Sequence, residues 1–185
     1  MGFHLAMHGV AQSDPVFAFN QRAKALGWTF TCCPAGDFQR VELNDALALW
    51  RRKAGDRPMP ERSDLTARDM KRFITNMSLL ERVQTPGAAR YRVRLHGTML
   101  VRYSGDKTGQ FLDDFVPRHL VGSYSGVYDA ALQLLAPLRL ISKFQAPEVD
   151  HLEGESLIAP LSTSNEKTPL ILSITYVERR LLRSS

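Results

Sequence analysis

The side chains best suited to acid–base chemistry in this sequence lie close to one helix start. Asp113 and Asp114 are neighbouring carboxylates, and His119 follows them at the beginning of a long helical pattern. Adjacent side chains on an extended or capping segment diverge, so we predict that the two carboxylates cap the helix that begins near Pro117. A small α+β cavity enzyme of isomerase or hydratase type would need one of these groups buried with a perturbed pKa, and it is kept as an alternative function.

Metal binding and nucleophilic catalysis are not predicted. His4 and His8 have the i, i+4 spacing that can hold a metal on one helix face, but no third ligand lies near them in the sequence. Cys32 and Cys33 are adjacent and cannot form a disulfide without strain, so we expect two small loop side chains in a reducing cytoplasm. Because no phosphate-binding glycine loop, nucleophile elbow or zinc-type spacing occurs, the sequence predicts no catalytic residue, no metal and no enzymatic activity.

A pocket with aromatic and hydroxyl side chains is the stronger candidate for a functional site. The predicted ligand-binding residues are Tyr103, Phe111, Phe115, His119, Tyr124, Tyr128, Ser142 and Phe144. Ser173 and Thr175 offer further hydroxyls that would orient a ligand. Aromatic residues also fill protein cores, so a ligand-free core and a small-molecule pocket both stay open, and the sequence identifies no cofactor.

Hydrophobic periodicity predicts the elements that have to position these residues. Tyr91, Val93 and Leu95 alternate with basic residues, which is typical of a strand with one buried face. Apolar residues at helical spacing predict a helix over 117–135. Strands are expected before it over 77–83 and 90–96, and after it over 138–144, 157–161 and 170–176. Two strands, a helical insertion and a three-strand meander indicate an α+β fold, with a five-stranded antiparallel sheet and helices on one face.

Two segments precede this core. Residues 1–38 form a lead segment with a helix-start signal at Ser13-Asp14-Pro15, and they either cap the sheet, pair with a second chain or stay weakly ordered. Residues 39–76 contain an apolar stripe over Leu43–Ala54 that predicts a flanking helix, followed by a connector rich in arginine and proline. The core domain then covers residues 77–180.

Three patterns in this sequence resemble those of a bacterial family of short, stand-alone PAS-domain proteins. They are the Trp50 helix with the connector Arg57-Pro58-Met59-Pro60-Glu61-Arg62, the run Tyr91-Arg92, Arg94, Gly97-Thr98, Gly105 and Thr108-Gly109, and the late Ala159-Pro160-Leu161-Ser162. The similarity extends from Leu43 to Val177 and implies a PAS-like fold. It also implies a sensory or regulatory module in which the flanking helix forms a dimer contact and the core can host a small molecule.

The same resemblance limits the choice of cofactor. Light-sensing relatives that form a covalent flavin adduct use a cysteine in the central helices, and this chain has none there. Haem-binding relatives use a histidine in the region of His119, but a single histidine near a helix start does not predict haem. The cofactor is therefore left as unknown.

The charge and hydropathy of the chain indicate whether nucleic acid, a membrane or another protein is the expected partner. The chain has 24 lysines and arginines against 19 acidic residues, which gives a net charge of +5. No known recognition motif accompanies this charge, so nucleic-acid binding through a basic surface is an alternative that we do not expect. No apolar run approaches the roughly 20 residues that span a bilayer. We expect a cytoplasmic protein that forms a homodimer through the Leu43–Ala54 helix and acts on an unknown signalling protein.

Overall fold

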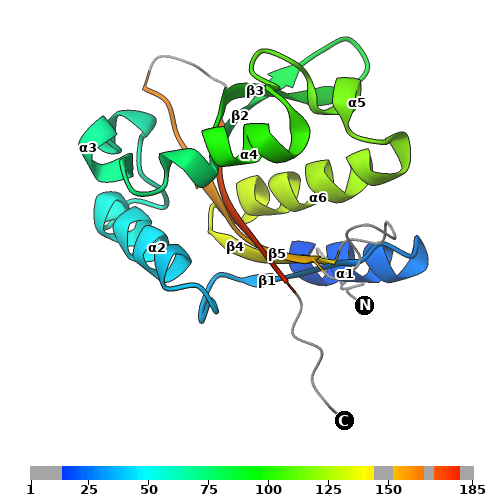
Figure 1. The fold of residues 1–185 in the computed structure, drawn as a ribbon, viewed down its shortest axis with the longest axis horizontal. Coiled ribbons are helices and arrows are strands. Elements are labelled where there is room, and N and C mark those ends of the chain that lie inside the picture. Colours follow the sequence, from blue (N-terminus) through cyan, green and yellow to red (C-terminus); the bar gives the residue numbers. More distant parts are fainter. Residues whose placement is uncertain (1–13, 144–151, 165–168, 180–185) are drawn as a thin grey trace, which may run out of the picture.

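Six strands form one sheet with helices on both of its faces (Figure 1). The computed structural model describes residues 14–143, 152–164 and 169–179. The strands, each antiparallel to its neighbours, are β1 (Phe30–Pro34), β2 (Met77–Gln84), β3 (Ala89–His96), β4 (Leu138–Lys143), β5 (Leu152–Leu161) and β6 (Leu170–Arg179), in the order β1-β4-β5-β6-β2-β3. The helices are α1 (Pro15–Ala25), α2 (Val41–Ala54), α3 (Ala67–Met70), α4 (Thr98–Ser104), α5 (Leu112–Phe115) and α6 (Arg118–Leu134), with the 3-10 turns η1 (Arg62–Asp64) and η2 (Ile74–Asn76).

The predicted order of elements is confirmed, and the sheet contains one strand more than the five expected. The two strands before the helical region, the long helix and the three strands after it lie where the periodicity placed them. The additional strand is β1, which pairs with β4 from Phe30↔Ser142 to Pro34↔Leu138. A run of only five residues that ends in proline has no clear alternation and is typical of a loop, so the sequence alone did not reveal it.

Cys32 and Cys33 lie in β1, so the prediction of a loop position is wrong. The side chain of Asn20 in α1 completes the outer edge of this strand. It donates to the Cys32 carbonyl (2.7 Å) and accepts from the Cys32 N–H (2.9 Å). The pairing occupies backbone groups that an edge strand otherwise offers to another strand. Both cysteines are free thiols, and Cys32 is the buried one.

These two neighbouring thiols should differ strongly in reactivity. Burial, with smaller contributions from Cys33 and Asp14, raises the pKa of the Cys32 thiol to about 12, so near neutral pH almost none of it is the reactive thiolate. We expect iodoacetamide to modify the native protein at Cys33 and to reach Cys32 only after denaturation. Peptide mapping of the alkylated protein measures this, and equal labelling of both thiols in the native state would contradict it.

One face of the sheet, here called the inner face, is covered by α1 and by α4 to α6. Its buried cluster contains Val16, Phe19 and Ala23 of α1, Val127, Ala130 and Ala131 of α6, and Leu138, Leu140, Ile158 and Ile171 of the sheet. The described part of the lead segment therefore caps the sheet, which is one of the three arrangements expected for it. Burial of apolar side chains from both helices and strands supplies the main stabilisation of this layer.

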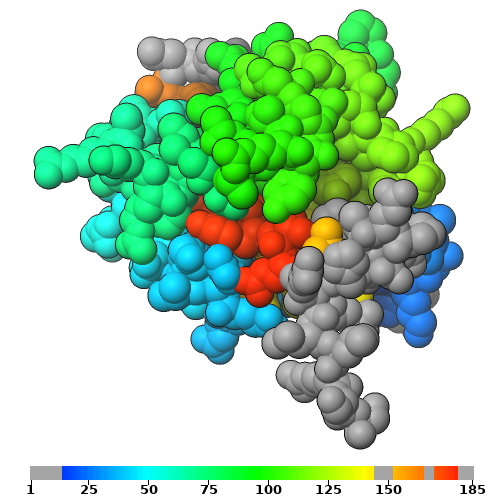
Figure 2. Space-filling model, in the orientation of Figure 1, coloured from blue at the N-terminus to red at the C-terminus, as the bar shows by residue number. Residues whose placement is uncertain are grey.

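The opposite face is covered by α2, whose apolar stripe packs against the sheet of the same chain. Leu43 and Leu47 are buried, and the indole N–H of Trp50 donates to the Pro160 carbonyl (2.9 Å). The helix predicted over Leu43–Ala54 is confirmed, but this stripe is already covered and is not free to meet a second copy. Figure 2 shows that β6 reaches the surface between α2 and α4, where the two helical layers do not meet.

The chain between β3 and α4 passes very close to η2. A Cβ at Gly97 would overlap the backbone carbonyl oxygens of Ile74 (2.5 Å) and Thr75. Gly97 is also the N-cap of α4, although the next residue, Thr98, has a side chain better suited to that position. The helix ends at Gly105, whose positive φ of 75° favours glycine, although its ψ of 168° lies outside the left-handed α region that is usual at a helix end.

Candidate functional site

A pocket of about 490 Å³ lies between α4, α5, α6 and the inner face of the sheet. Its volume falls within the ~300–1,000 Å³ that is usual for small-molecule sites. The helices contribute apolar walls, among them Leu100 of α4, Leu112 and Phe115 of α5 and Leu120 of α6. The strands contribute the floor, in which apolar and hydroxyl side chains are mixed.

Hydroxyl groups form a band across this floor. Ser156 of β5 pairs with Thr175 of β6, and their hydroxyl oxygens are 2.8 Å apart. Two residues earlier on β6, Ser173 pairs with Ser78 of β2, and Ser78 pairs in turn with His96 of β3. All five residues line the pocket. The pairing register of four strands therefore brings these polar groups into one continuous hydroxyl band, the name used for them below.

His96 connects the hydroxyl band to helix α4. Its Nδ1 lies 3.0 Å from Ser78 Oγ, and its Nε2 lies 3.1 Å from Ser104 Oγ. The Ser104 hydroxyl donates to the Leu100 carbonyl (3.1 Å), so it accepts from an N–H on His96 Nε2. His96 Nδ1 is then the acceptor for the Ser78 hydroxyl. Burial lowers the pKa of His96, which favours the neutral imidazole near pH 7.

Apart from that of Tyr103, which is largely exposed, three pocket hydroxyls make no hydrogen bond to another described residue: those of Tyr124, Tyr128 and Ser173. Tyr128 and Ser173 are only 5% and 7% exposed, yet neither hydroxyl is sealed in by protein atoms, so both reach the open space of the pocket. Burial raises the pKa of Tyr124 and, with a smaller contribution from Tyr124, that of Tyr128. These tyrosines therefore stay protonated and remain available as donors.

The described lining of the pocket carries no formal charge. It includes no lysine, arginine, aspartate or glutamate, and its one histidine, His96, is held neutral by burial. A charged molecule would lose its hydration shell on entering and would find no opposite charge there. The pocket thus combines apolar walls with neutral hydrogen-bonding groups.

Five of the eight predicted ligand-binding residues line this pocket: Tyr103, Phe115, Tyr124, Tyr128 and Ser142. Tyr103 is 64% exposed and therefore lies at the rim. The two additional hydroxyl residues considered with them, Ser173 and Thr175, belong to the floor. Helices α4, α5 and α6 and the strands β4 and β6 bring these side chains together, because all of them lie on the same side of the sheet.

Three predicted residues are not placed in the pocket. The Phe111 ring lies under the guanidinium group of Arg90, 3.9 Å from the ring centroid, and is not part of the lining. His119 is exposed in the first turn of α6 and lines a neighbouring cleft instead. Phe144 lies outside the described residues.

Sequence reasoning missed His96, Ser78, Ser104 and Ser156 as pocket residues. A position at the end of a strand beside a turn favours exposure, but His96 is half-buried between Ser78 and Ser104. The alternation of side chains along the strands could have identified them, because residues two apart on a strand lie on the same face. Ser78 shares the inner face with Leu80, and Ser156 shares it with Ile158. Small polar residues in phase with buried apolar residues were the sign of a polar pocket floor.

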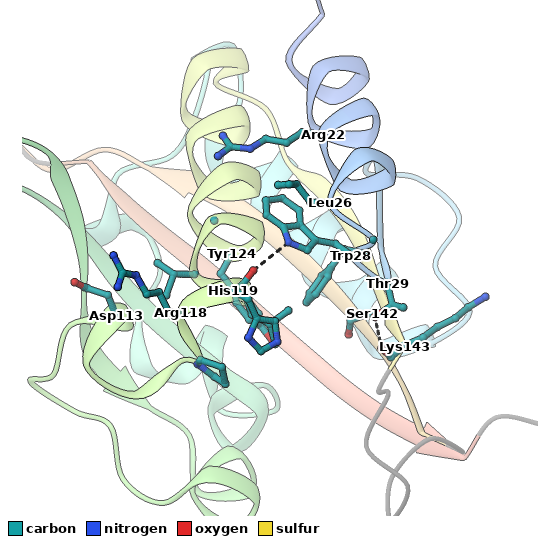
Figure 3. Close-up of a pocket in the computed structure, with 16 residues that line it drawn as sticks. Arg22, Leu26, Trp28, Thr29, Asp113, Arg118, His119, Tyr124, Ser142 and Lys143 are labelled. Atoms are coloured by element: carbon teal, nitrogen blue, oxygen red, sulfur yellow. Dashed lines mark hydrogen bonds between the residues drawn. The ribbon is translucent and has the colours of Figure 1, made fainter.

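A wider cleft of about 1,150 Å³ adjoins the pocket between the α1–β1 junction and the start of α6 (Figure 3). The two hollows share the wall residues Pro117, Leu120, Tyr124 and Ser142. Trp28 closes one side of the cleft, and its indole N–H donates to the His119 carbonyl (3.1 Å). Arg118, His119 and Lys143 are exposed on the rim of the cleft.

Asp113 and Asp114 are engaged in structural contacts. Asp114 accepts from the Phe111 N–H (3.0 Å) at the start of α5, and both carboxylates pair with Arg90 at 2.9–3.0 Å. The prediction that they cap the long helix is wrong: Asp114 caps α5 instead, and among the described residues no side chain caps α6. Neither carboxylate lines the 490 Å³ pocket. Asp113 and His119 both line the wider cleft, where Asp113 is held in its ion pair with Arg90 and His119 is exposed.

The basic side of β3 is largely neutralised. Arg92 and Arg94 both contact the Glu81 carboxylate, at 2.7 and 3.1 Å, and Glu81 is only 7% exposed. Burial opposes ionisation of Glu81, but the hydrogen bonds from the two arginines outweigh it and lower its pKa. With Arg90 held by Asp113 and Asp114, this surface offers a nucleic acid few unpaired cations.

Comparisons with known proteins identify a family for most of the chain. A family model described as "PAS domain" matches residues 39–175. Among solved structures, "Structure of an RNA-binding Light-Oxygen-Voltage Receptor" is similar with a TM-score of 0.41 and 8% sequence identity, over 80% of this chain. The matched region is 38% of that structure's own chain. No curated protein matches this sequence.

Proposed function

Because the chain belongs to the PAS domain family, we propose that it is a sensory or regulatory module that binds a small molecule in its pocket and acts through protein–protein contacts. The α+β, PAS-like fold predicted from the sequence agrees with the family match and with the antiparallel sheet. The observation that carries the proposal is the pocket of about 490 Å³ with unpaired hydroxyls that reach into it.

A bound molecule would influence the surface through two contacts. The first is the His96–Ser104 hydrogen bond, which joins the pocket floor to α4. The second is the edge-to-face contact between Tyr124 and Phe30 of β1, whose ring centroids are 5.2 Å apart. A ligand that favours one arrangement of these contacts would shift the position of α4 or of the α1–β1 segment. The affinity of a partner protein that binds either element would then change.

The partner and the compartment belong to the proposal. We propose a signalling protein as the partner, and a homodimer that uses the exposed side of α2 with Arg51 and Arg52, since its apolar side is covered by the sheet. Within the described residues, no helix has the length and apolar character needed to cross a bilayer. Two free cysteines suit a reducing compartment, and we place the module in the cytoplasm.

Dye binding by a pocket-filling variant tests this function. The neutral dye Nile red should bind the full chain with a rise in fluorescence, and Ser173→Leu, which adds a buried side chain to the floor, should weaken binding by about tenfold. The matched control is Ser63→Leu, which adds the same group at an exposed site in η1 and should bind like the parent protein. Equal dye binding by Ser173→Leu and Ser63→Leu would contradict the proposal that the pocket binds a small molecule.

Native mass spectrometry of the same proteins tests the other parts. A stoichiometric extra mass on the parent protein, absent from Ser173→Leu, is the expected sign of a ligand that co-purifies. A dimer mass that Arg51→Glu abolishes is expected if α2 forms the contact. A monomer at all concentrations would contradict the dimer without affecting the pocket.

A further inference from the structure

We infer that the pocket recognises an uncharged, largely apolar molecule that carries a hydrogen-bond acceptor, such as an ester or ketone oxygen. The inference rests on the proposed function and narrows it to one class of ligand. It follows from three features of the pocket: hydroxyl donors without partners, a lining without charge, and the hydrogen-bond chain through His96 that ends on a backbone carbonyl.

The first feature is the set of free donors. The hydroxyls of Tyr128 and Ser173 have no partner among the described residues, although both side chains are more than nine-tenths buried. Burying such groups without a hydrogen bond costs free energy, so they favour a molecule that brings an acceptor. Of Ser156 and Thr175, which share one hydrogen bond, one hydroxyl proton is also left over.

The second feature is the direction of the hydrogen bonds at His96. The Ser78 hydroxyl donates to His96 Nδ1, His96 Nε2–H donates to Ser104, and Ser104 donates to the Leu100 carbonyl. Every proton in this chain is already used within the protein. A ligand is therefore met by the free protons of Tyr128 and Ser173 and by the oxygen lone pairs of the band, an environment that suits an ester, ketone or alcohol.

The third feature is the absence of charge in the described lining. A carboxylate or ammonium group would be desolvated with no counter-ion, which costs more than neutral hydrogen bonds return. The apolar walls from α4, α5 and α6 match the remainder of the ligand. A free fatty acid, which has the right apolar body, is excluded by its head group, whereas its ester is accepted.

Displacement of Nile red from the full chain at pH 8 by three probes of similar length tests the inference. The probes are methyl octanoate, octane and octanoate, which differ in acceptor and charge. Methyl octanoate should displace the dye most effectively, octane about fivefold less and octanoate on the order of a hundredfold less. Tyr128→Phe and Ser173→Ala should each weaken methyl octanoate about fivefold and leave octane unchanged.

The control is Tyr91→Phe, which also removes a buried tyrosine hydroxyl. The Tyr91 hydroxyl donates to Asp129 (2.7 Å) and does not line the pocket, so this variant should keep the order of the three probes. Octanoate binding as tightly as methyl octanoate would overturn the neutral-ligand inference while leaving the pocket function intact. So would an unchanged ester affinity in both hydroxyl variants. Failure of Nile red to bind the parent protein would overturn the proposed function, and this inference with it.

Discussion

Replacing Gly97 by alanine should destabilise the protein by about 4 kcal/mol or prevent it from folding. Gly97 has φ −67° and ψ 148°, which any residue adopts, so the backbone conformation does not require glycine. The cause is steric, because a Cβ would overlap backbone oxygens of Ile74 and Thr75. These atoms belong to the short turn that leads into β2 and have no side-chain freedom with which to move away. Urea unfolding followed by tryptophan fluorescence measures the loss.

Gly36→Ala is the matched control for this substitution. Gly36 is exposed, and a Cβ built there meets no atom within 4 Å, so the change in the free energy of unfolding should stay within about 0.5 kcal/mol. If Gly97→Ala proved as stable as Gly36→Ala, the close approach between η2 and the start of α4 would be contradicted.

Replacing Glu155 by alanine should cost about 3 kcal/mol of stability, because it leaves a mostly buried arginine without its partner. Glu155 is 11% exposed and Arg139 is 18% exposed, and their closest atoms are 2.6 Å apart. The same carboxylate accepts from the backbone N–H groups of Gln39 (3.0 Å) and Arg40 (3.2 Å). The substitution thus removes an ion pair and also releases the segment between β1 and α2. Thermal unfolding should report a lower melting temperature, by about 6–12 °C.

Two further variants separate these effects. Glu153→Ala removes the same charge two residues earlier on β5, where the described residues provide no ion pair, and should cost less than about 1 kcal/mol. The double variant Glu155→Ala with Arg139→Ala should be more stable than the sum of the two single losses predicts. Strict additivity, or equal losses for Glu153→Ala and Glu155→Ala, would contradict a coupled buried pair.

Two glycines show which structural features can be predicted from the sequence and which cannot. At Gly105 a glycine after a helical stretch indicates the helix end, and the helix does end there with a positive φ, although ψ is outside the left-handed α region. At Gly97 the sequence indicated a turn, but the glycine is required because another segment of the chain lies against it. A positive φ is a local property, whereas a close approach between residues 74–75 and 97 depends on the packing of the whole sheet.

Helix α2 likewise has one feature that the sequence predicted and one that only the tertiary structure decided. Its apolar stripe was evident from the spacing of Leu43, Leu47 and Trp50, and it is buried as predicted. The sequence predicted that this helix makes a dimer contact but could not say what covers its apolar stripe. The structure places the protein's own sheet against the stripe, with Trp50 bonded to Pro160. Periodicity identifies a face that must be covered but carries no information on its partner.

By itself, the sequence determined the strand and helix periods, the order of elements and the family motifs, because these depend on residues close together in the chain. It also identified five residues of the pocket, from aromatic and hydroxyl groups at the right period. Only the tertiary structure decided how the strands are ordered and in which register they pair. The hydroxyl band results from that register, since Ser78, His96 and Ser173 become neighbours only when β6, β2 and β3 lie side by side.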